Sequence, residues 1–236
     1  MTGAGYDVLA PHYREYARTR AAYCGAVDTR VLEWRPRHVH AMLDVGSGDG
    51  SRAVRLAALM SAPRLVLSDP SLPMAEHCRS HHGAEVWPCA AEDLPGGPAD
   101  FDVITCLWNV LGAVEPASAR AEALRRMRAR LSPEGRLFLD VHNRYNARAA
   151  GVGRVLTRFV RDRVLPSEAN GRVTFTWTVA GLTIPSSGYL CAAAEMRRLF
   201  RNAGLGIVHQ AFVDYDTGAA RGQWTGQMLF CLAAQA

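Results

Sequence analysis

The sequence predicts an open, doubly wound α/β sheet that is mostly parallel and forms one domain over residues 1–236. Short apolar runs alternate with helical stretches through the first 141 residues. The connections between them are short, so right-handed crossovers should place helices on both faces of the sheet. With 236 residues, of which 49% are hydrophobic and 21% are charged, the chain is long enough for one large core.

Five apolar runs are the expected strands of the first part, because strands buried on both faces are apolar without alternation. These runs are 41–45, 65–68, 85–87, 101–107 and 136–141. Three helices are expected between them, at 51–60, 72–80 and 117–131. The third carries Leu124, Met127 and Leu131 on one side and arginines elsewhere, which is typical of a surface helix. We expect a turn at 132–135, Ser-Pro-Glu-Gly, to follow it.

The alternation breaks between residues 143 and 189. A basic amphipathic stretch at 154–165 precedes an alternating strand at 173–179. Regular structure then resumes with a helix at 192–203 and two strands at 206–213 and 227–233. We therefore expect an insertion into an otherwise regular sheet.

Composition argues against several classes of partner. The 27 basic and 22 acidic residues give a net charge of +5, and every Lys/Arg position is arginine, which indicates coding bias. The arginines are spread along the chain rather than clustered with aromatic residues, so nucleic acid is not the favoured partner. No apolar run approaches the roughly 18 residues that span a bilayer, and residues 1–10 do not resemble a signal peptide. We expect a cytoplasmic protein with no membrane partner.

The six cysteines predict neither disulfides nor a metal site. They contain no CxxC pair and no Cys/His spacing that suits zinc. Cys106 and Cys231 lie within apolar runs and are expected to be buried thiols. Asp140 and Asn143 lack the further acidic residue that a magnesium site needs. We expect no metal.

The strongest local motif is Leu-Asp-Val-Gly-Ser-Gly-Asp-Gly at 43–50, where a strand runs through a glycine-rich turn into a helix. Gly46, Ser47 and Gly48 let the backbone approach a ligand closely, and the helix N-terminus favours negative charge. The spacing is GxGxG rather than the GxGxxG of nicotinamide-binding proteins. Asp44, two residues before the first glycine, would repel a diphosphate but suits an ammonium group. This argues against a nicotinamide-dependent oxidoreductase.

Five motifs in order along the chain make it similar to the class I S-adenosylmethionine (SAM)-dependent methyltransferases, in the small-molecule branch. They are the glycine-rich turn, Asp-Pro-Ser at 69–71 with Met74, Ala-Glu-Asp-Leu-Pro at 91–95, Phe-Asp-Val-Ile at 101–104 and Ser-Pro-Glu-Gly-Arg-Leu at 132–137. The resemblance implies a Rossmann-like methyltransferase fold with a seven-stranded sheet, and it covers residues 38–141 well. Fold alone does not settle the function.

The resemblance also implies which residues hold the cofactor SAM, whose product is S-adenosylhomocysteine. Asp44, Gly46, Ser47 and Gly48 would hold the methionine part with Cys106, Trp108 and Asn109. Asp69 would accept hydrogen bonds from the ribose hydroxyls, beside Pro70 and Met74. The adenine would lie against Ala91, Glu92, Asp93 and Leu94. Each position also has a structural alternative: Asp69 could start a turn, Glu92 and Asp93 could be a solvated loop, and Trp108 could fill the core.

Two further segments are expected to cover the site. Residues 1–35 resemble the helical lid of small-molecule methyltransferases, and Tyr6, Tyr13 and Tyr16 would contact the acceptor or pack a peripheral helix. The insertion at 143–190 would form a substrate cap, with Asn143 and Arg144 as weaker substrate-binding candidates. Residues 191–236 would complete the fold as a C-terminal helix and strands.

The expected reaction transfers a methyl group from SAM to an O or N atom of a small-molecule acceptor, as in bacterial specialised metabolism. A hydroxyl acceptor would need a base. Residues 111–113, Leu-Gly-Ala, lack the histidine of some relatives, so His142 is the candidate base, with a structural histidine as the alternative. An RNA or protein methyltransferase of the same fold and a non-catalytic SAM-binding module stay open. The expected assembly is a monomer or a homodimer.

Overall fold

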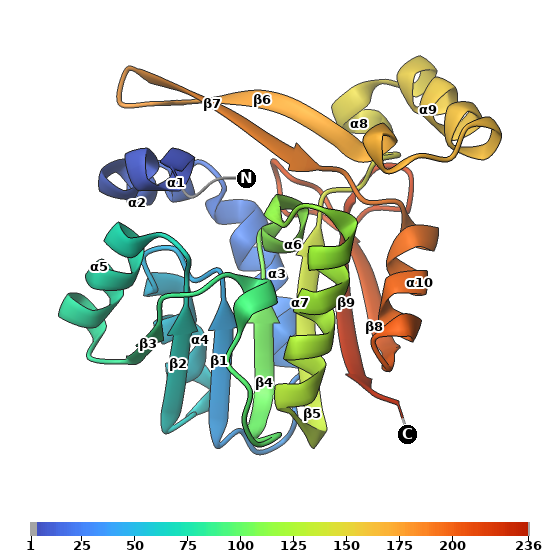
Figure 1. Ribbon diagram of the computed structural model, residues 1–236. Helices are drawn as coiled ribbons and strands as arrows, with labels where there is room; N and C mark the ends of the chain where they lie inside the picture. The colour runs from blue at the N-terminus through green and yellow to red at the C-terminus, as the bar shows by residue number, and fades with distance from the viewer. Residues whose placement is uncertain (1–3, 236) are drawn as a thin grey trace.

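A seven-stranded sheet forms the centre of the computed structural model, which describes residues 4–235 (Figure 1). The strand order is β3-β2-β1-β4-β5-β9-β8, and β9 runs in the direction opposite to the other six strands. The strands are β1 (Ala41–Val45), β2 (Arg64–Ser68), β3 (Glu85–Trp87), β4 (Phe101–Cys106), β5 (Leu131–Val141), β8 (Leu205–Val213) and β9 (Gln227–Ala234). The predicted doubly wound, mostly parallel sheet is confirmed.

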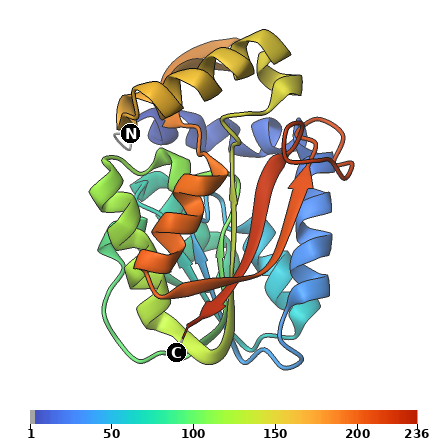
Figure 2. The same ribbon diagram turned by 90° about the vertical axis from the view of Figure 1, so that its right-hand side faces the viewer.

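Helices cover both faces of this sheet (Figures 1 and 2). One face carries α3 (Ala21–Trp34), α4 (Ser51–Met60) and α5 (Leu72–His82), and the other carries α7 (Ala117–Arg130) and α10 (Ala193–Asn202). Along β1, Leu43 and Val45 join the core under α7 and α10, whereas Met42 joins the core under α3 and α4. Successive side chains of a strand point to opposite faces of the sheet, so neighbouring residues of β1 join different cores. No helix in the described part of the chain is long and apolar enough to cross a membrane.

A layer of other elements lies above the carboxyl ends of the parallel strands (Figure 1). The lid consists of α1 (Ala4–Leu9), a short 3-10 helix (Ala10–His12) and α2 (Tyr13–Arg18). The cap contains α8 (Ala147–Ala150), α9 (Val152–Val164), a 3-10 turn (Glu168–Gly171) and a hairpin of β6 (Arg172–Val179) and β7 (Leu182–Tyr189). We call the lid and this hairpin together the roof. Residues 1–3 of the expected lid and residue 236 of the C-terminal segment lie outside the described residues.

The roof is held together by its own small apolar cluster. Leu9 of the lid is buried against Trp177, Val179 and Ile184 of the hairpin. Tyr6, Tyr13 and Tyr16 pack around the same cluster. The lid therefore packs against a segment about 170 residues away along the chain.

Two strands, β5 and β7, differ from the sequence prediction. Strand β5 begins at Leu131 rather than at residue 136, because Leu131 pairs with Phe101 before the chain bulges and pairs again from Arg136. The predicted turn at 132–135 is thus a bulge within a longer strand. Strand β7 was not expected, since Pro185 and Gly188 normally weaken a strand, but a two-stranded hairpin has free edges that tolerate proline.

The site expected from this topology lies where the strand order reverses. From β1 the chain proceeds to β2 and β3 on one side, and β4 then pairs on the other side of β1. In open α/β sheets, ligands bind beyond the carboxyl ends of the strands at such a point. The tips of β1, β2 and β4 meet there.

Candidate active site

The glycine-rich turn at the tip of β1 is fixed by main-chain hydrogen bonds to β2. The amide groups of Gly46 and Ser47 both donate to the carbonyl of Ser68, at 2.7 and 2.9 Å. Gly46 has a φ of 75°, and a Cβ atom there would come within 2.4 Å of the Val110 side chain. Only glycine suits this position, so the predicted close turn is explained by both backbone angle and space.

Asp69 lies at the carboxyl end of β2, and its side chain fixes the turns around it. One carboxylate oxygen accepts from the Gly48 amide at 2.8 Å, and the other accepts from the Ser71 amide at 2.9 Å. Burial raises the pKa of Asp69 to about 6, although these two amides favour the ionised form. The turn role is thus observed, and the ligand role stays a prediction that the further lone pair on each oxygen permits.

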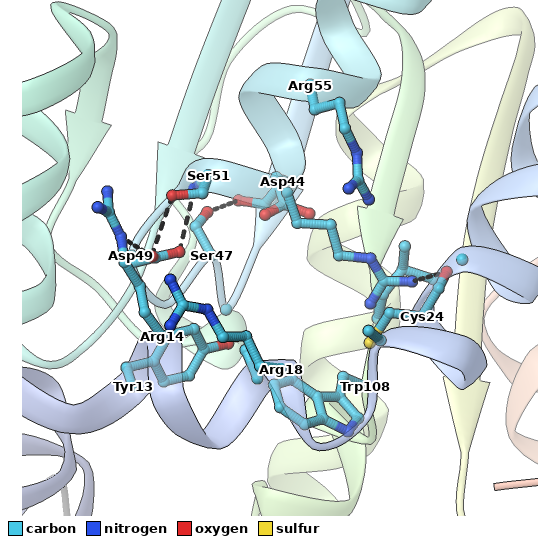
Figure 3. A pocket seen from close by; sticks show the side chains of 16 residues that line it. Tyr13, Arg14, Arg18, Cys24, Asp44, Ser47, Asp49, Ser51, Arg55 and Trp108 are labelled. Atoms are coloured by element: carbon cyan, nitrogen blue, oxygen red, sulfur yellow. Dashed lines mark hydrogen bonds and ion pairs between the residues drawn. The ribbon is translucent and has the colours of Figure 1, made fainter. Parts of the chain in front are cut away.

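A cavity of about 340 Å³ opens beside the glycine-rich turn, between α2, α3 and the start of α4 (Figure 3). Its wall includes Asp44, Gly46 and Ser47 from the turn and Trp108 from the segment after β4. The volume lies within the range of about 300–1,000 Å³ typical of small-molecule sites. Four of the predicted cofactor residues thus line one cavity.

Four arginines line the same cavity and were not predicted. Arg52 and Arg55 on α4 pair with the buried Asp28 of α3, while Arg14 of the lid donates to Asp49 at 3.1 Å. For Arg18, the fourth, no acidic partner is found within residues 4–235. The cavity therefore has an available guanidinium as well as a carboxylate.

Asp44 is that carboxylate, and it is held in one orientation. One of its oxygens accepts a hydrogen bond from the Thr105 hydroxyl at 2.5 Å, and burial raises its pKa. The hydroxyl of Ser47 donates to the Asp44 main-chain carbonyl at 2.9 Å. An ammonium group of a ligand would relieve the cost of burying this carboxylate.

The segment after β4 adopts a backbone conformation rare for side-chain-bearing residues. Trp108 and Asn109 have φ values of 64° and 61°. The amide of Trp108 donates to the buried carboxylate of Asp140, which also accepts from the Tyr23 hydroxyl at 2.5 Å. The Asn109 side chain accepts from the His142 amide at 2.9 Å. Strain held by such contacts is typical of functional sites, and here it aims the Trp108 ring at the cavity.

The lid places aromatic rings over this wall. Tyr16 stacks on Trp108 with ring centres 5.3 Å apart, and Tyr13 contacts the edge of the same indole at 5.9 Å. Tyr6 packs on Trp177 of the hairpin at 5.0 Å. Burial raises the pKa of all three phenols. These neutral rings form an apolar cover, with Tyr13 directly above Gly48.

His142 lies at the tip of β5 beside the aromatic cover. Its ring meets Tyr215 edge-on at 4.9 Å, and the Tyr215 hydroxyl accepts from the Trp108 indole at 3.0 Å. The buried Nε2 atom has no hydrogen-bond partner in the described structure. Burial lowers the pKa of His142 to about 4, so the imidazole is neutral at neutral pH.

The segment predicted to contact the adenine, residues 91–94, is partly buried in the core and partly exposed to solvent. Ala91 and Leu94 are buried in the core under α7, and Asp93 is exposed. Glu92 lies between them, and its buried Oε2 atom has no partner in the described structure. Of these four predicted residues, Glu92 is the one with a buried side-chain polar atom that no described residue contacts by a hydrogen bond. Cys106 is likewise buried in the core, while its neighbour Leu107 lines the cavity.

Pro70 and Met74 flank Asp69 without reaching the cavity. Pro70 is exposed, and Met74 is buried under the first turn of α5. The amide of Met74 donates to the Ser71 hydroxyl, which caps the helix. Both residues shape the Asp69 turn.

Asn143 and Arg144 are not brought to the cavity. The Asn143 amide group donates to the carbonyls of Gln223 and Gly226, at 2.7 and 3.0 Å. Arg144 pairs with Asp162 and Glu195 and is buried. Both residues join the cap to the C-terminal segment, and their contact with a substrate stays a prediction.

The cavity residues that were not predicted, the four arginines and Asp49, have only weak signals in the local sequence. Arg52 lies two residues after the glycine-rich turn and Asp49 lies within it, so their position beside the cavity could have been predicted from the sequence. Arg14 and Arg18 are four residues apart on a short helix whose packing depends on Trp108 and Trp177. No periodicity indicates such a long-range contact.

Comparison with known proteins agrees with this geometry. Residues 42–135 match the family model described as a methyltransferase domain. They include the glycine-rich turn, Asp69 and the segment after β4. No curated protein matches the sequence.

Many solved structures match the fold, and three represent them. An S-adenosylmethionine-dependent methyltransferase from Clostridium acetobutylicum has a TM-score of 0.68 at 12% identity, covering 95% of this chain and 99% of that chain. The 1,6-didemethyltoxoflavin-N1-methyltransferase of Burkholderia thailandensis, solved with its substrate and S-adenosylhomocysteine, has a TM-score of 0.62 at 16% identity, covering 99% and 88%. The sugar N-methyltransferase KedS8 from Streptoalloteichus has a TM-score of 0.62 at 17% identity, covering 95% and 91%. At these identities the likeness shows a shared fold.

Proposed function

Because the chain carries a class I SAM-dependent methyltransferase domain, we propose that it transfers the methyl group of SAM to an O or N atom of a small-molecule acceptor. The observation that carries this proposal is the charge arrangement of the cavity. Asp44 and Arg18 line one space of about 340 Å³. An α-amino acid presents an ammonium and a carboxylate together, which this pair complements.

The residues present fit the rest of SAM as well. Asp69 would accept from the ribose hydroxyls, and the unpartnered Oε2 of Glu92 is the polar atom available toward the adenine. The Trp108 ring at the cavity wall suits a sulfonium cation. SAM supplies an electrophilic methyl group, so the protein's main task is to orient the acceptor and exclude water.

The roof supports a small acceptor. Neutral tyrosine rings and Trp177 cover the strand tips, so an acceptor beside Trp108 would lie in an enclosed apolar site. A folded RNA or an intact protein would need a wider and more polar approach. The small-molecule reading is therefore favoured over an RNA or protein methyltransferase.

We propose His142 as the base for a hydroxyl acceptor. Its imidazole is neutral at neutral pH and its buried Nε2 has an unused lone pair or proton. General base catalysis contributes about 10²–10⁴-fold. An amine acceptor that binds unprotonated would not need this residue.

The function is tested in two steps. Calorimetric titration should show SAM binding to the purified chain, and binding should weaken at least about tenfold, or 1.4 kcal/mol, in Asp44→Ala. Labelled SAM is then incubated with a library of hydroxyl- and amine-bearing small molecules, and with tRNA and protein mixtures as separate arms. Label in a small molecule supports the proposal; label only in RNA or protein, or SAM binding without any transfer, overturns it.

Variants of two histidines then test the base with a hydroxyl acceptor. His142→Gln should lower kcat by about 100-fold or more, whereas His209→Gln should leave it unchanged. His209 is a suitable control because its ring stacks on Trp34, away from the cavity. An unchanged kcat in both variants would leave His142 with a structural role only.

A further inference from the structure

Helix α9 presents an apolar stripe to solvent. Val152, Leu156, Val160 and Val164 recur every four residues, with exposed fractions of 75%, 61%, 53% and 68%. An adjacent side of the same helix is packed: Val155 is buried, and Phe159 contacts Tyr145 and Trp224. The exposed stripe is therefore a second apolar face, which the fold of this chain does not use.

The same helix carries a positive charge that its surroundings do not neutralise. Within residues 4–235, neither Arg154 nor Arg163 has an acidic partner, and Arg158 donates only to the Arg144 carbonyl. Asp162 is the one acid of the helix, and it is bound by Arg144 and the Tyr145 hydroxyl at 3.0 and 2.7 Å. Desolvation and the nearby arginines lower the pKa of Arg158, as a local excess of positive charge requires.

We infer that the outer face of α9 binds the surface of a lipid bilayer that carries anionic headgroups. A helix with an exposed apolar stripe beside arginines suits the interface plane, where the stripe enters the acyl boundary and the guanidinium groups meet phosphates. The exposed Trp224, next to Phe159, adds an aromatic ring of the kind enriched at membrane interfaces. A spanning helix is not required.

Two features favour lipid over another protein. The stripe lies on a helix at the outer rim of the molecule, above the strand tips, and its residues line neither of the two cavities beside α3 (Figures 1 and 2). A bilayer accepts such a convex face without a shaped groove. A second copy of the chain would bring two sets of unpaired arginines together, which costs free energy.

This inference revises the expectation of no membrane partner. The composition argues against a spanning segment, but a helix that lies on the membrane surface does not need the length of a spanning helix. Helix α9 has 13 residues. The inference does not depend on methyl transfer, and SAM titration of each variant reports separately on the cavity.

The test measures sedimentation of the full chain with vesicles of phosphatidylcholine alone and of phosphatidylcholine mixed with phosphatidylglycerol. We expect binding to the mixed vesicles that added salt weakens, and much less to phosphatidylcholine alone. Leu156→Ser should reduce the partition coefficient at least about fivefold. Leu59→Ser is the matched control, because Leu59 is a helical leucine with a similar exposed fraction, 56%.

A second pair of variants tests the charge. Arg154→Gln should weaken binding to mixed vesicles about fivefold, corresponding to about 1 kcal/mol per basic residue at an anionic surface. Arg198→Gln on α10, another exposed arginine, should leave binding unchanged. Absence of vesicle binding overturns the inference, as does binding that Leu156→Ser and Leu59→Ser alter equally. A dimer in solution that Leu156→Ser dissociates would also overturn it, since the stripe would then be covered by a second copy.

Discussion

The strand tips and the roof hold their functional side chains by different forces. At the tips, main-chain hydrogen bonds fix the geometry: Asp69 accepts from the Gly48 and Ser71 amides, and Gly46 donates to Ser68. In the roof, ring contacts between distant segments do so, as where Tyr6 packs on Trp177. Directional bonds to the backbone fix positions closely, whereas ring packing is less directional and permits movement.

This difference suggests separate roles for the strand tips and the roof. We propose that the polar groups of the tips recognise SAM and that the apolar surface of the roof encloses it. Substitutions at the tips should therefore change SAM affinity, while substitutions in the roof should change access and acceptor turnover. The four predictions below test this division.

The largest effect is expected from Asp69→Ala. It removes the acceptor for two main-chain amides as well as the proposed ribose contact, so SAM affinity should fall by about 10–100-fold. Calorimetric titration measures the change, with Glu76→Ala on the exposed side of α5 as the control. An equal loss of SAM affinity in a roof variant would contradict the division of roles.

The pH dependence of SAM affinity should follow the ionisation of Asp69. Its pKa is raised to about 6, so the carboxylate gains a proton as the pH falls through this value and accepts hydrogen bonds less well. Affinity should be constant above about pH 7 and about tenfold weaker at pH 5, with most of the loss below pH 6. In Asp69→Asn, which cannot ionise, this dependence should disappear. If it persists in that variant, another group is responsible.

A smaller effect is expected from Arg18→Gln. Arg18 lines the cavity and no acidic partner is found for it within the described residues, so its proposed partner is the carboxylate of SAM. Losing one exposed charge-assisted hydrogen bond should weaken SAM binding about fivefold. Arg30→Gln on α3, which removes an exposed arginine paired with Glu33, should have no effect in the same titration.

The smallest change in SAM affinity, less than about threefold, is expected from Trp177→Ala. This substitution removes the ring on which Tyr6 and Tyr16 pack, so the lid should detach more often while the strand tips stay intact. Trypsin cleavage after Arg14 and Arg18 should become faster than in the unsubstituted chain. Unchanged cleavage would show that the hairpin does not hold the lid.

The strand tips could be predicted from the sequence better than the roof, because the tips depend on local turns and the roof depends on contacts between distant segments. Gly46, Asp44 and Asp69 act through turns of a few residues, so their spacing carries the information. The ion pairs of Arg144 were not predicted, because its partners Asp162 and Glu195 lie 18 and 51 residues away along the chain. Strand β7 was missed because its proline and glycine are tolerated only in a hairpin, and its turn uses Ala180 and Gly181 with positive φ.

The position of Tyr13 has a kinetic consequence. Its ring lies so close to Gly48 that a Cβ atom there would approach it within 2.5 Å, and the Gly48 amide donates to Asp69, the proposed ribose ligand. We therefore expect SAM to enter only when the lid moves away from the strand tips. The observed association rate should level off at high nucleoside concentration, at the frequency of that opening, and departure of the spent nucleoside should be subject to the same delay.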